Sequence, residues 1–167
     1  MTRVGSRGTR VGLISDTHGL LRPEAVAALR GSDRIIHGGD IGDPAVLTAL
    51  AANAPVTAVR GNNDCDPWAH AVDEVALLQV DDVAIYVVHD VGDLRRTPPP
   101  RGTRVVVSGH SHKPGVVERD GVLYVNPGSA GPRRFTLPIA VAELLIDGSR
   151  VDTRIVELAV APAARTR

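Results

Sequence analysis

The sequence predicts an α/β protein in which two β-sheets pack on each other and helices lie outside. Three observations lead to this prediction. The first 60 residues alternate short apolar runs with helical segments, the pattern of a parallel sheet with crossover helices. The remainder consists almost entirely of short Val- and Ile-rich runs separated by turns. The chain has 167 residues, of which 43% are hydrophobic, enough to form one core.

Strands are expected where apolar runs too short for helices are bounded by Gly, Asp, Asn or Pro. In chain order they are Arg10–Ser15, Arg34–His37, Val56–Arg60, Val75–Val80, Val83–His89, Arg104–Ser108, Gly115–Arg119, Val122–Val125, Ile139–Ile146 and Val151–Leu158. The pairs Asp81-Asp82 and Asp120-Gly121 predict hairpin turns.

Two helices are expected between the early strands. Pro23–Arg30 begins with proline and is followed by Gly31, the usual punctuation of a helix. Pro44–Ala52 also begins with proline and follows Asp43, a good N-cap residue. The segment Val91–Gly102 contains three prolines and cannot be a helix interior there. It is expected to form either a solvated loop or the lip of a cleft.

Charge and composition exclude several classes of protein. Basic and acidic residues both number 19, which argues against binding to nucleic acid or membranes through bulk charge. No apolar run approaches the roughly 18–20 residues of a membrane span, and the N-terminus does not read as a signal peptide. With Cys65 as the single cysteine, the expected location is the cytoplasm. We expect one domain over residues 1–167, its core at about 10–158, with edge strands that allow a homo-oligomer.

Polar, glycine-marked clusters directly follow six of the predicted strands. They are Asp16-Thr17-His18, His37-Gly38-Gly39-Asp40, Gly61-Asn62-Asn63-Asp64, His89-Asp90, Gly109-His110-Ser111-His112 and Asn126-Pro127-Gly128-Ser129. In open α/β sheets, ligands bind beyond the carboxyl ends of the strands. If the strands point the same way, the clusters meet at one rim.

These clusters contain the donors of a metal site. The candidates are Asp16, His18, Asp40, Asn62, His89, His110 and His112. The absence of a thiolate argues against structural zinc, and mixed nitrogen and oxygen donors suit Mn, Fe, Zn, Co or Ni. Seven donors are too many for one ion, whereas two ions sharing a carboxylate use them all. Such a metal pair can clamp the attacking and leaving oxygens of a phosphoryl group.

In this order the clusters resemble the motifs DxH, GD, GNH[DE], HG and GHxH of the calcineurin-like metallophosphoesterase superfamily. The Asn126-Pro127-Gly128-Ser129 turn and the chain length are similar to the small YfcE-type phosphodiesterases. The resemblance extends from about Arg10 to Leu158. It implies a four-layer αββα sandwich of two mixed β-sheets flanked by helices.

The resemblance also implies a dinuclear site and its reaction. One ion would bind Asp16, His18, Asp40 and His112, and the other Asp40, Asn62, His89 and His110. A hydroxide bridging the ions would attack a phosphodiester in line, with Asp40, Asn62, Asn63 and His89 as catalytic residues. The expected cofactors are two divalent ions, manganese first, with nickel, cobalt, zinc or iron as alternatives. The expected partner is a small phosphoester, nucleotide-derived compounds included.

The sequence departs from the family pattern at two positions. Asn63 replaces a histidine, and its amide can hydrogen-bond a phosphate oxygen but cannot act as a general acid. Asp90 replaces a glycine, and its carboxylate would either orient His89 or repel an anionic substrate. Of the remaining residues, His37 is expected to pack behind the site, and Asp64 to hold its own turn.

Two other functions stay open at this point. The same site could hydrolyse phosphomonoesters or nucleotides, and the balanced charge does not discriminate between these substrates. The fold could also serve as a non-catalytic interaction scaffold, as in a retromer subunit that shares it. The complete set of ligand positions argues against the scaffold.

Overall fold

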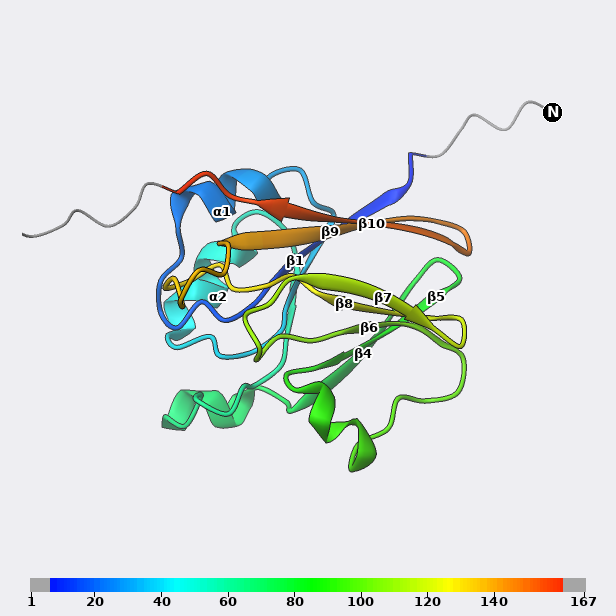
Figure 1. Ribbon diagram of the computed structural model, residues 1–167, viewed down its shortest axis with the longest axis horizontal. Helices are drawn as coiled ribbons and strands as arrows, with labels where there is room; N and C mark the ends of the chain where they lie inside the picture. The colour runs from blue at the N-terminus through cyan, green and yellow to red at the C-terminus, as the bar shows by residue number, and fades with distance from the viewer. Residues whose placement is uncertain (1–6, 161–167) are drawn as a thin grey trace, which may run out of the picture.

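A computed structural model describes residues 7–160, which form two five-stranded sheets stacked on each other (Figure 1). The first sheet has the order β10-β9-β1-β2-β3 and the second β4-β5-β6-β8-β7. The strands are β1 (Thr9–Ile14), β2 (Arg34–His37), β3 (Val56–Ala58), β4 (Val75–Val80), β5 (Val83–Val88), β6 (Thr103–Val107), β7 (Gly115–Arg119), β8 (Val122–Asn126), β9 (Ala140–Asp147) and β10 (Arg150–Glu157). The predicted α/β sandwich is confirmed.

Both sheets are mixed. In the first, β1, β2 and β3 run parallel, and β9 lies antiparallel between β1 and β10. In the second, β5, β6 and β8 run parallel, and β4 and β7 are antiparallel edge strands. Within each sheet, the strands that precede the polar clusters therefore end on the same side.

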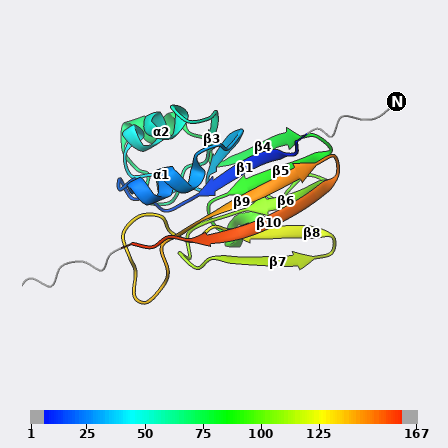
Figure 2. The same ribbon diagram turned by 90° about the horizontal axis from the view of Figure 1, so that it is seen from above.

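The two predicted helices are confirmed and lie together, away from β7 and β8 (Figure 2). They are α1 (Pro23–Leu29) and α2 (Pro44–Ala51). Asp43 caps α2 by accepting a hydrogen bond from the Ala45 N–H at 2.8 Å. Gly31, with φ of +84°, lets the chain leave α1 in a left-handed conformation. The buried faces of both helices pack on Ile14 and Ile35 of the first sheet.

Apolar side chains between the sheets form the main core. It includes Val11, Leu13, Ile36, Val83, Ile85, Val87, Val105, Val107, Leu144 and Ile146. On the outer face of the second sheet, Leu94 from the 3₁₀ helix η2 (Val91–Arg95) packs against Tyr86 and Val88. This flanking layer is thin because, within residues 7–160, neither α-helix packs on that face.

Two short helices were not expected from the sequence. The segment after the third polar cluster forms the 3₁₀ helix η1 (Pro67–Ala71), and the proline-rich segment begins with η2. Strand β3 ends at Ala58, earlier than predicted, and the backbone N–H of Arg60 donates to the Asp73 carbonyl instead of to β2. No helix in the part of the chain described here is long and apolar enough to cross a membrane.

Candidate metal centre

Five strands bring the predicted metal ligands to one place. Strands β1, β2 and β3 of the first sheet end just before three of the clusters, and β5 and β6 of the second sheet end before two more. Each predicted donor lies within 3.5 Å of another: Asp16, His18, Asp40, Asn62, His89, His110 and His112. The site is therefore built by both sheets at their shared edge.

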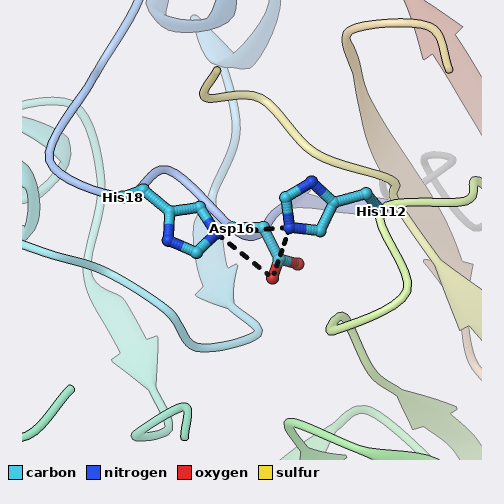
Figure 3. Close-up of side chains that lie close together, drawn as sticks. All are labelled: Asp16, His18 and His112. Atoms are coloured by element: carbon cyan, nitrogen blue, oxygen red, sulfur yellow. Dashed lines mark hydrogen bonds and ion pairs between the residues drawn. The ribbon is translucent and has the colours of Figure 1, made fainter. Parts of the chain in front are cut away.

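Asp16, His18 and His112 form the first group of potential ligands (Figure 3). His18 Nε2 lies 3.2 Å from His112 Nε2. Asp16 Oδ1 lies 3.4 Å from His112 Nε2 and 3.9 Å from His18 Nε2. Two imidazole nitrogens and one carboxylate oxygen thus face a common point.

Asp40, His89 and His110 form the second group, to which Asn62 adds an amide oxygen. Asp40 Oδ2 lies 3.3 Å from His89 Nε2. Asn62 Oδ1 lies 3.1 Å from His89 Nε2 and 3.0 Å from His110 Nδ1. Because His89 Nδ1 is 2.7 Å from the Gly38 carbonyl oxygen and donates to it, Nε2 is the nitrogen free to bind an ion.

Asp40 lies between the two groups. Its Oδ2 is 3.8 Å from His18 Nε2 of the first group and 3.3 Å from His89 Nε2 of the second. Asn63 holds the carboxylate by donating its backbone N–H to Oδ1 and its side-chain amide to Oδ2, both at 2.9 Å. The Asn63 amide, a group able to hydrogen-bond a phosphate oxygen, is thus engaged with Asp40. A carboxylate in this position can serve both groups at once.

Asp40 and His89 lie close together, and each shifts the pKa of the other. Burial raises the pKa of Asp40, but hydrogen bonds from His89 and Asn63 outweigh it and hold the pKa well below its ordinary value. Burial lowers the pKa of His89, but Asp40 and the Gly38 carbonyl outweigh it and raise the pKa above its ordinary value. A metal ion can bind His89 Nε2 only when that nitrogen has lost its proton. The affinity for the ion should therefore decrease as the pH is lowered.

The arrangement of donors fits bound cations. Asp16 Oδ1 is buried and receives no hydrogen bond from any residue between 7 and 160. Asn62 Oδ1 faces ring nitrogens of both His89 and His110. A buried carboxylate oxygen without a hydrogen bond is costly, and a cation bound at Asp16 would satisfy it. Divalent ions that accept mixed nitrogen and oxygen ligands meet this requirement.

Most of these ligands have a strained backbone. Five have φ in the left-handed region: Asp16 (53°), His18 (46°), Asp40 (53°), His110 (70°) and His112 (60°). For residues other than glycine this conformation costs roughly 1–2 kcal/mol each. Such residues cluster at functional sites, where the surrounding fold holds them.

Two glycines let neighbouring loops approach the carboxylates. A Cβ atom on Gly61 would collide with both the side chain and the backbone of Asp40. A Cβ atom on Gly109 would collide with Ser15 and Asp16. The glycines of these motifs therefore provide the space in which the ligands sit.

His37 lies outside both ligand groups, as expected, and ties two loops together. Its Nδ1 accepts the Gly39 N–H at 3.1 Å, so Nε2 carries the hydrogen and donates to Thr17 Oγ1 at 3.0 Å. The Thr17 hydroxyl in turn donates to the Ile41 carbonyl at 2.8 Å. Burial lowers the pKa of His37 from 6.5 to about 4, so the ring is neutral at pH 7.

Asp64 connects the loops after β2 and β3. Its Oδ2 accepts the Gly61 N–H at 2.9 Å within its own turn, as expected. The same oxygen accepts the Ile41 N–H at 3.1 Å, and Oδ1 accepts the Gly42 N–H at 2.9 Å. The buried carboxylate thus fixes the turn that carries Asn62 against the turn that follows Asp40.

Asp90, for which the sequence left open a role in orienting His89 or in repelling an anionic substrate, faces His110 instead of His89. Its Oδ2 lies 3.6 Å from His110 Nε2, and its Oδ1 accepts the Gly92 N–H at 2.9 Å to cap η2. His89 already donates its Nδ1 hydrogen to Gly38. Adjacency in the sequence suggested the wrong histidine, because alternate residues along a strand point in different directions.

A cavity of about 330 Å³ opens beside the second ligand group. Asn62, His89 and His110 line one wall. The rest of the lining includes Arg60, Glu74, Asp90, Asp93, Arg96 and Thr97. The proline-containing segment therefore contributes to the wall of a cleft, one of the two roles that the sequence left open.

Supporting residues come from the sixth polar cluster, Asn126-Pro127-Gly128-Ser129. The Asn126 side chain donates to the Gly109 carbonyl at 2.9 Å and to Ser111 Oγ at 3.1 Å. Ser129 Oγ donates to the Asp16 carbonyl at 3.0 Å. The position of this cluster at a strand end was the signal that could have indicated these contacts.

Comparison with known proteins finds relatives over most of the chain. The family described as "Calcineurin-like phosphoesterase superfamily domain" matches residues 9–149. A probable metallophosphoesterase from Methanothermobacter thermautotrophicus is 34% identical over 168 residues, covering 93% of this chain and 96% of that protein.

Solved structures share the fold. An archaeal phosphodiesterase aligns with a TM-score of 0.74 at 25% identity, covering 90% of this chain and 100% of that chain. Vacuolar protein sorting 29 from Cryptosporidium parvum aligns with a TM-score of 0.71 at 20% identity, covering 91% of this chain and 98% of that chain. The second likeness concerns the fold alone.

Proposed function

Because the chain belongs to the calcineurin-like phosphoesterase superfamily, we propose that it is a phosphodiesterase that uses two divalent metal ions. The observation that carries the proposal is the placement of Asp40 between two groups of nitrogen and oxygen donors. The similarity to an archaeal phosphodiesterase supports a diester substrate.

The proposed ligands follow from the two groups. Asp16, His18 and His112 would hold one ion, Asn62, His89 and His110 the other, and Asp40 both. When bound, the ions would lower the pKa of a water molecule and neutralise charge on the phosphate. Manganese is the ion that we propose first, with iron, zinc, cobalt and nickel as alternatives, because all of them accept mixed imidazole and carboxylate ligands.

Protonation of the leaving group sets a limit on the proposed reaction. The Asn63 amide is bonded to Asp40 and has no acidic proton to give. The leaving oxygen must therefore depart as an anion or take a proton from water that enters the open cavity. Hydrolysis should be fastest for diesters with acidic leaving groups such as nitrophenol.

The test is hydrolysis of bis-p-nitrophenyl phosphate by purified protein that has been treated with EDTA and then given Mn, Ni, Co, Zn or Mg. Restored turnover is the expected result. Asp40→Ala and His110→Ala should abolish it, since each removes a proposed ligand. His70→Ala is the matched control, because His70 lies on η1, outside both ligand groups. Full activity of both ligand variants would refute the proposal.

A non-catalytic scaffold predicts a different result in the same experiment. Metal would be retained in elemental analysis, but no phosphodiester or phosphomonoester would be hydrolysed with any ion. A direct comparison of p-nitrophenyl phosphate with bis-p-nitrophenyl phosphate separates the monoester from the diester function.

A further inference from the structure

The cavity beside the second ligand group has a wall that the proposed reaction does not use. This wall carries two guanidinium groups and two carboxylates, from Arg60, Arg96, Glu74 and Asp93. Asn62, His89 and His110 of the second ligand group line the same cavity. A phosphodiester held at the ligand groups would therefore place one of its ester substituents in this cavity.

The charges of the wall are already paired with one another. Arg60 Nη2 donates to Glu74 Oε1 at 3.0 Å. Arg96 lies 3.7 Å from Glu74 and 3.7 Å from Asp93. With Asp90, which also lines the cavity, three carboxylates oppose two guanidinium groups. On this wall, away from the proposed metal ions, a second anionic group would meet more carboxylates than guanidinium groups, whereas a hydroxyl group finds donors and acceptors side by side.

The segment that carries Arg96 is held in place. Tyr86 of β5 donates its hydroxyl to the Thr97 carbonyl at 2.8 Å. Thr97 Oγ1 donates to the Asp93 carbonyl at 3.1 Å. Because the wall is ordered before a substrate arrives, little conformational entropy is lost on binding.

We infer that this cavity selects a neutral, hydroxyl-bearing substituent, such as a ribose or glycerol unit, over a substituent that carries a second phosphate. The inference rests on the proposed phosphodiesterase function and adds its substrate class. It assigns Arg96 a role in substrate specificity.

The test compares three esters with the same nitrophenol leaving group. They are the p-nitrophenyl ester of thymidine 5′-monophosphate, the same ester phosphorylated on the 3′-hydroxyl, and p-nitrophenyl phenylphosphonate. With manganese, kcat/KM should be about tenfold higher for the 3′-hydroxyl ester than for its 3′-phosphate, the effect of about one hydrogen bond to a charged group. Equal values, or a preference for the 3′-phosphate, would overturn the inference.

Arg96→Gln should raise KM for the thymidine 5′-monophosphate ester and leave the phenylphosphonate unchanged. Arg95→Gln is the matched control, because Arg95 precedes Arg96 as the last residue of η2 and does not line the cavity. Loss of activity on all esters by Arg96→Gln alone would contradict a role in specificity.

Binding separates failure of this inference from failure of the proposed function. Calorimetric titration of the manganese-loaded protein with thymidine 5′-monophosphate and thymidine 3′,5′-bisphosphate does not depend on turnover. Tighter binding of the monophosphate without hydrolysis of any ester would support the cavity and refute the enzyme. Equal binding of the two nucleotides together with rapid hydrolysis of the esters would support the enzyme and refute the selectivity of the cavity.

A second inference comes independently from Asp90. This carboxylate stands where the family pattern has glycine, and it lies 3.6 Å from His110 Nε2. The other ring nitrogen, His110 Nδ1, faces Asn62 Oδ1 in the second ligand group. A carboxylate on the far nitrogen of a metal-binding histidine keeps the hydrogen there and orients the ring.

The geometry points to Asp90 as a positioning residue that directs His110 Nδ1 toward the second metal ion. Asp90→Asn isolates this role, because the remaining Oδ1 can still accept the Gly92 N–H and cap η2. Asp93→Asn is the matched control, since it removes the same charge from the same helix without a contact to His110.

The affinity for manganese is measured by calorimetric titration. Asp90→Asn should weaken the second manganese ion about tenfold, the lower end for partners of metal ligands, and leave the first ion and the metal-free melting temperature unchanged. An equal loss of affinity in Asp93→Asn would show a general charge effect and overturn the inference. Unchanged affinity in Asp90→Asn would also overturn it.

Discussion

At the scale of single residues, His37 supports the site although it belongs to neither group of candidate metal ligands. Its folded pKa of about 4 lies below the ordinary value of 6.5. As pH falls, the unfolded chain therefore takes up a proton first. The stability that the neutral ring contributes is fully present above pH 6.5 and is lost between pH 6.5 and 4, in total about 3 kcal/mol. Urea unfolding of the metal-free protein across this range measures the loss.

His37→Gln serves as the control, because glutamine does not titrate. The unfolding free energy of the variant should change less between pH 6.5 and 4. If the unfolding free energies of wild type and His37→Gln changed equally with pH, protonation of His37 would not be the cause of the loss.

The candidate metal ligands affect stability in other pH ranges. His89, with a raised pKa, contributes stability that is lost as pH rises above 6.5, and Asp40, with a lowered pKa, contributes stability that is lost below pH 4.

The left-handed backbone of His18 leads to a second prediction at this scale. Its φ is 46°, a conformation that glycine adopts freely and alanine does not. In the metal-free protein, His18→Gly should therefore be more stable than His18→Ala by about 1 kcal/mol. At Ala49, on the exposed face of α2, the order should be reversed: Ala49→Gly should lower the unfolding free energy, because glycine weakens a helix. Chemical denaturation of the variants tests both signs.

At the scale of elements, the strands and the convergence of the candidate ligands were predictable for a simple reason. Apolar runs such as Leu13-Ile14 end abruptly at polar clusters with glycine, and parallel strands bring these ends together. The partners of Asp90 and Asn63 were not predictable, because they depend on where loops from different strands meet. Helix η1 was missed because five residues with one proline carry no periodicity.

The loops between elements depend on Asp64. Asp64→Asn leaves one acceptor oxygen for three N–H groups and places an amide N–H against the others. The expected loss is about 2 kcal/mol of unfolding free energy, since buried donors lose their partner, together with weaker manganese binding. Asp66→Asn is the control, because the Asp66 side chain makes no capping hydrogen bond in the neighbouring turn. Equal stabilities would contradict this role.

At the scale of the whole molecule, each ligand group joins the two sheets. Asp16 and His18 follow β1 of the first sheet, and His112 follows β6 of the second. Asp40 follows β2, and His89 and His110 follow β5 and β6. Bound ions would therefore cross-link the sheets.

This cross-linking predicts that metal binding stabilises the fold as a whole. Each ion at a free concentration a hundred times its Kd should add about 2.7 kcal/mol to the unfolding free energy. Thermal unfolding with EDTA and with increasing manganese measures the effect. The shift should shrink in Asp40→Ala, which removes the ligand common to both groups. An unchanged melting temperature at saturating manganese would count against any metal centre between the sheets.

The central place of β1 in the first sheet has a consequence for biosynthesis. This strand pairs with β2 on one side and with β9 on the other, so it gains its second neighbour only after residues 140–147 have been made. The last proposed ligand, His112, leaves the ribosome well before that segment. All the ligands would thus exist in the nascent chain before the fold can align them, and metal uptake would wait for a strand that contributes no ligand.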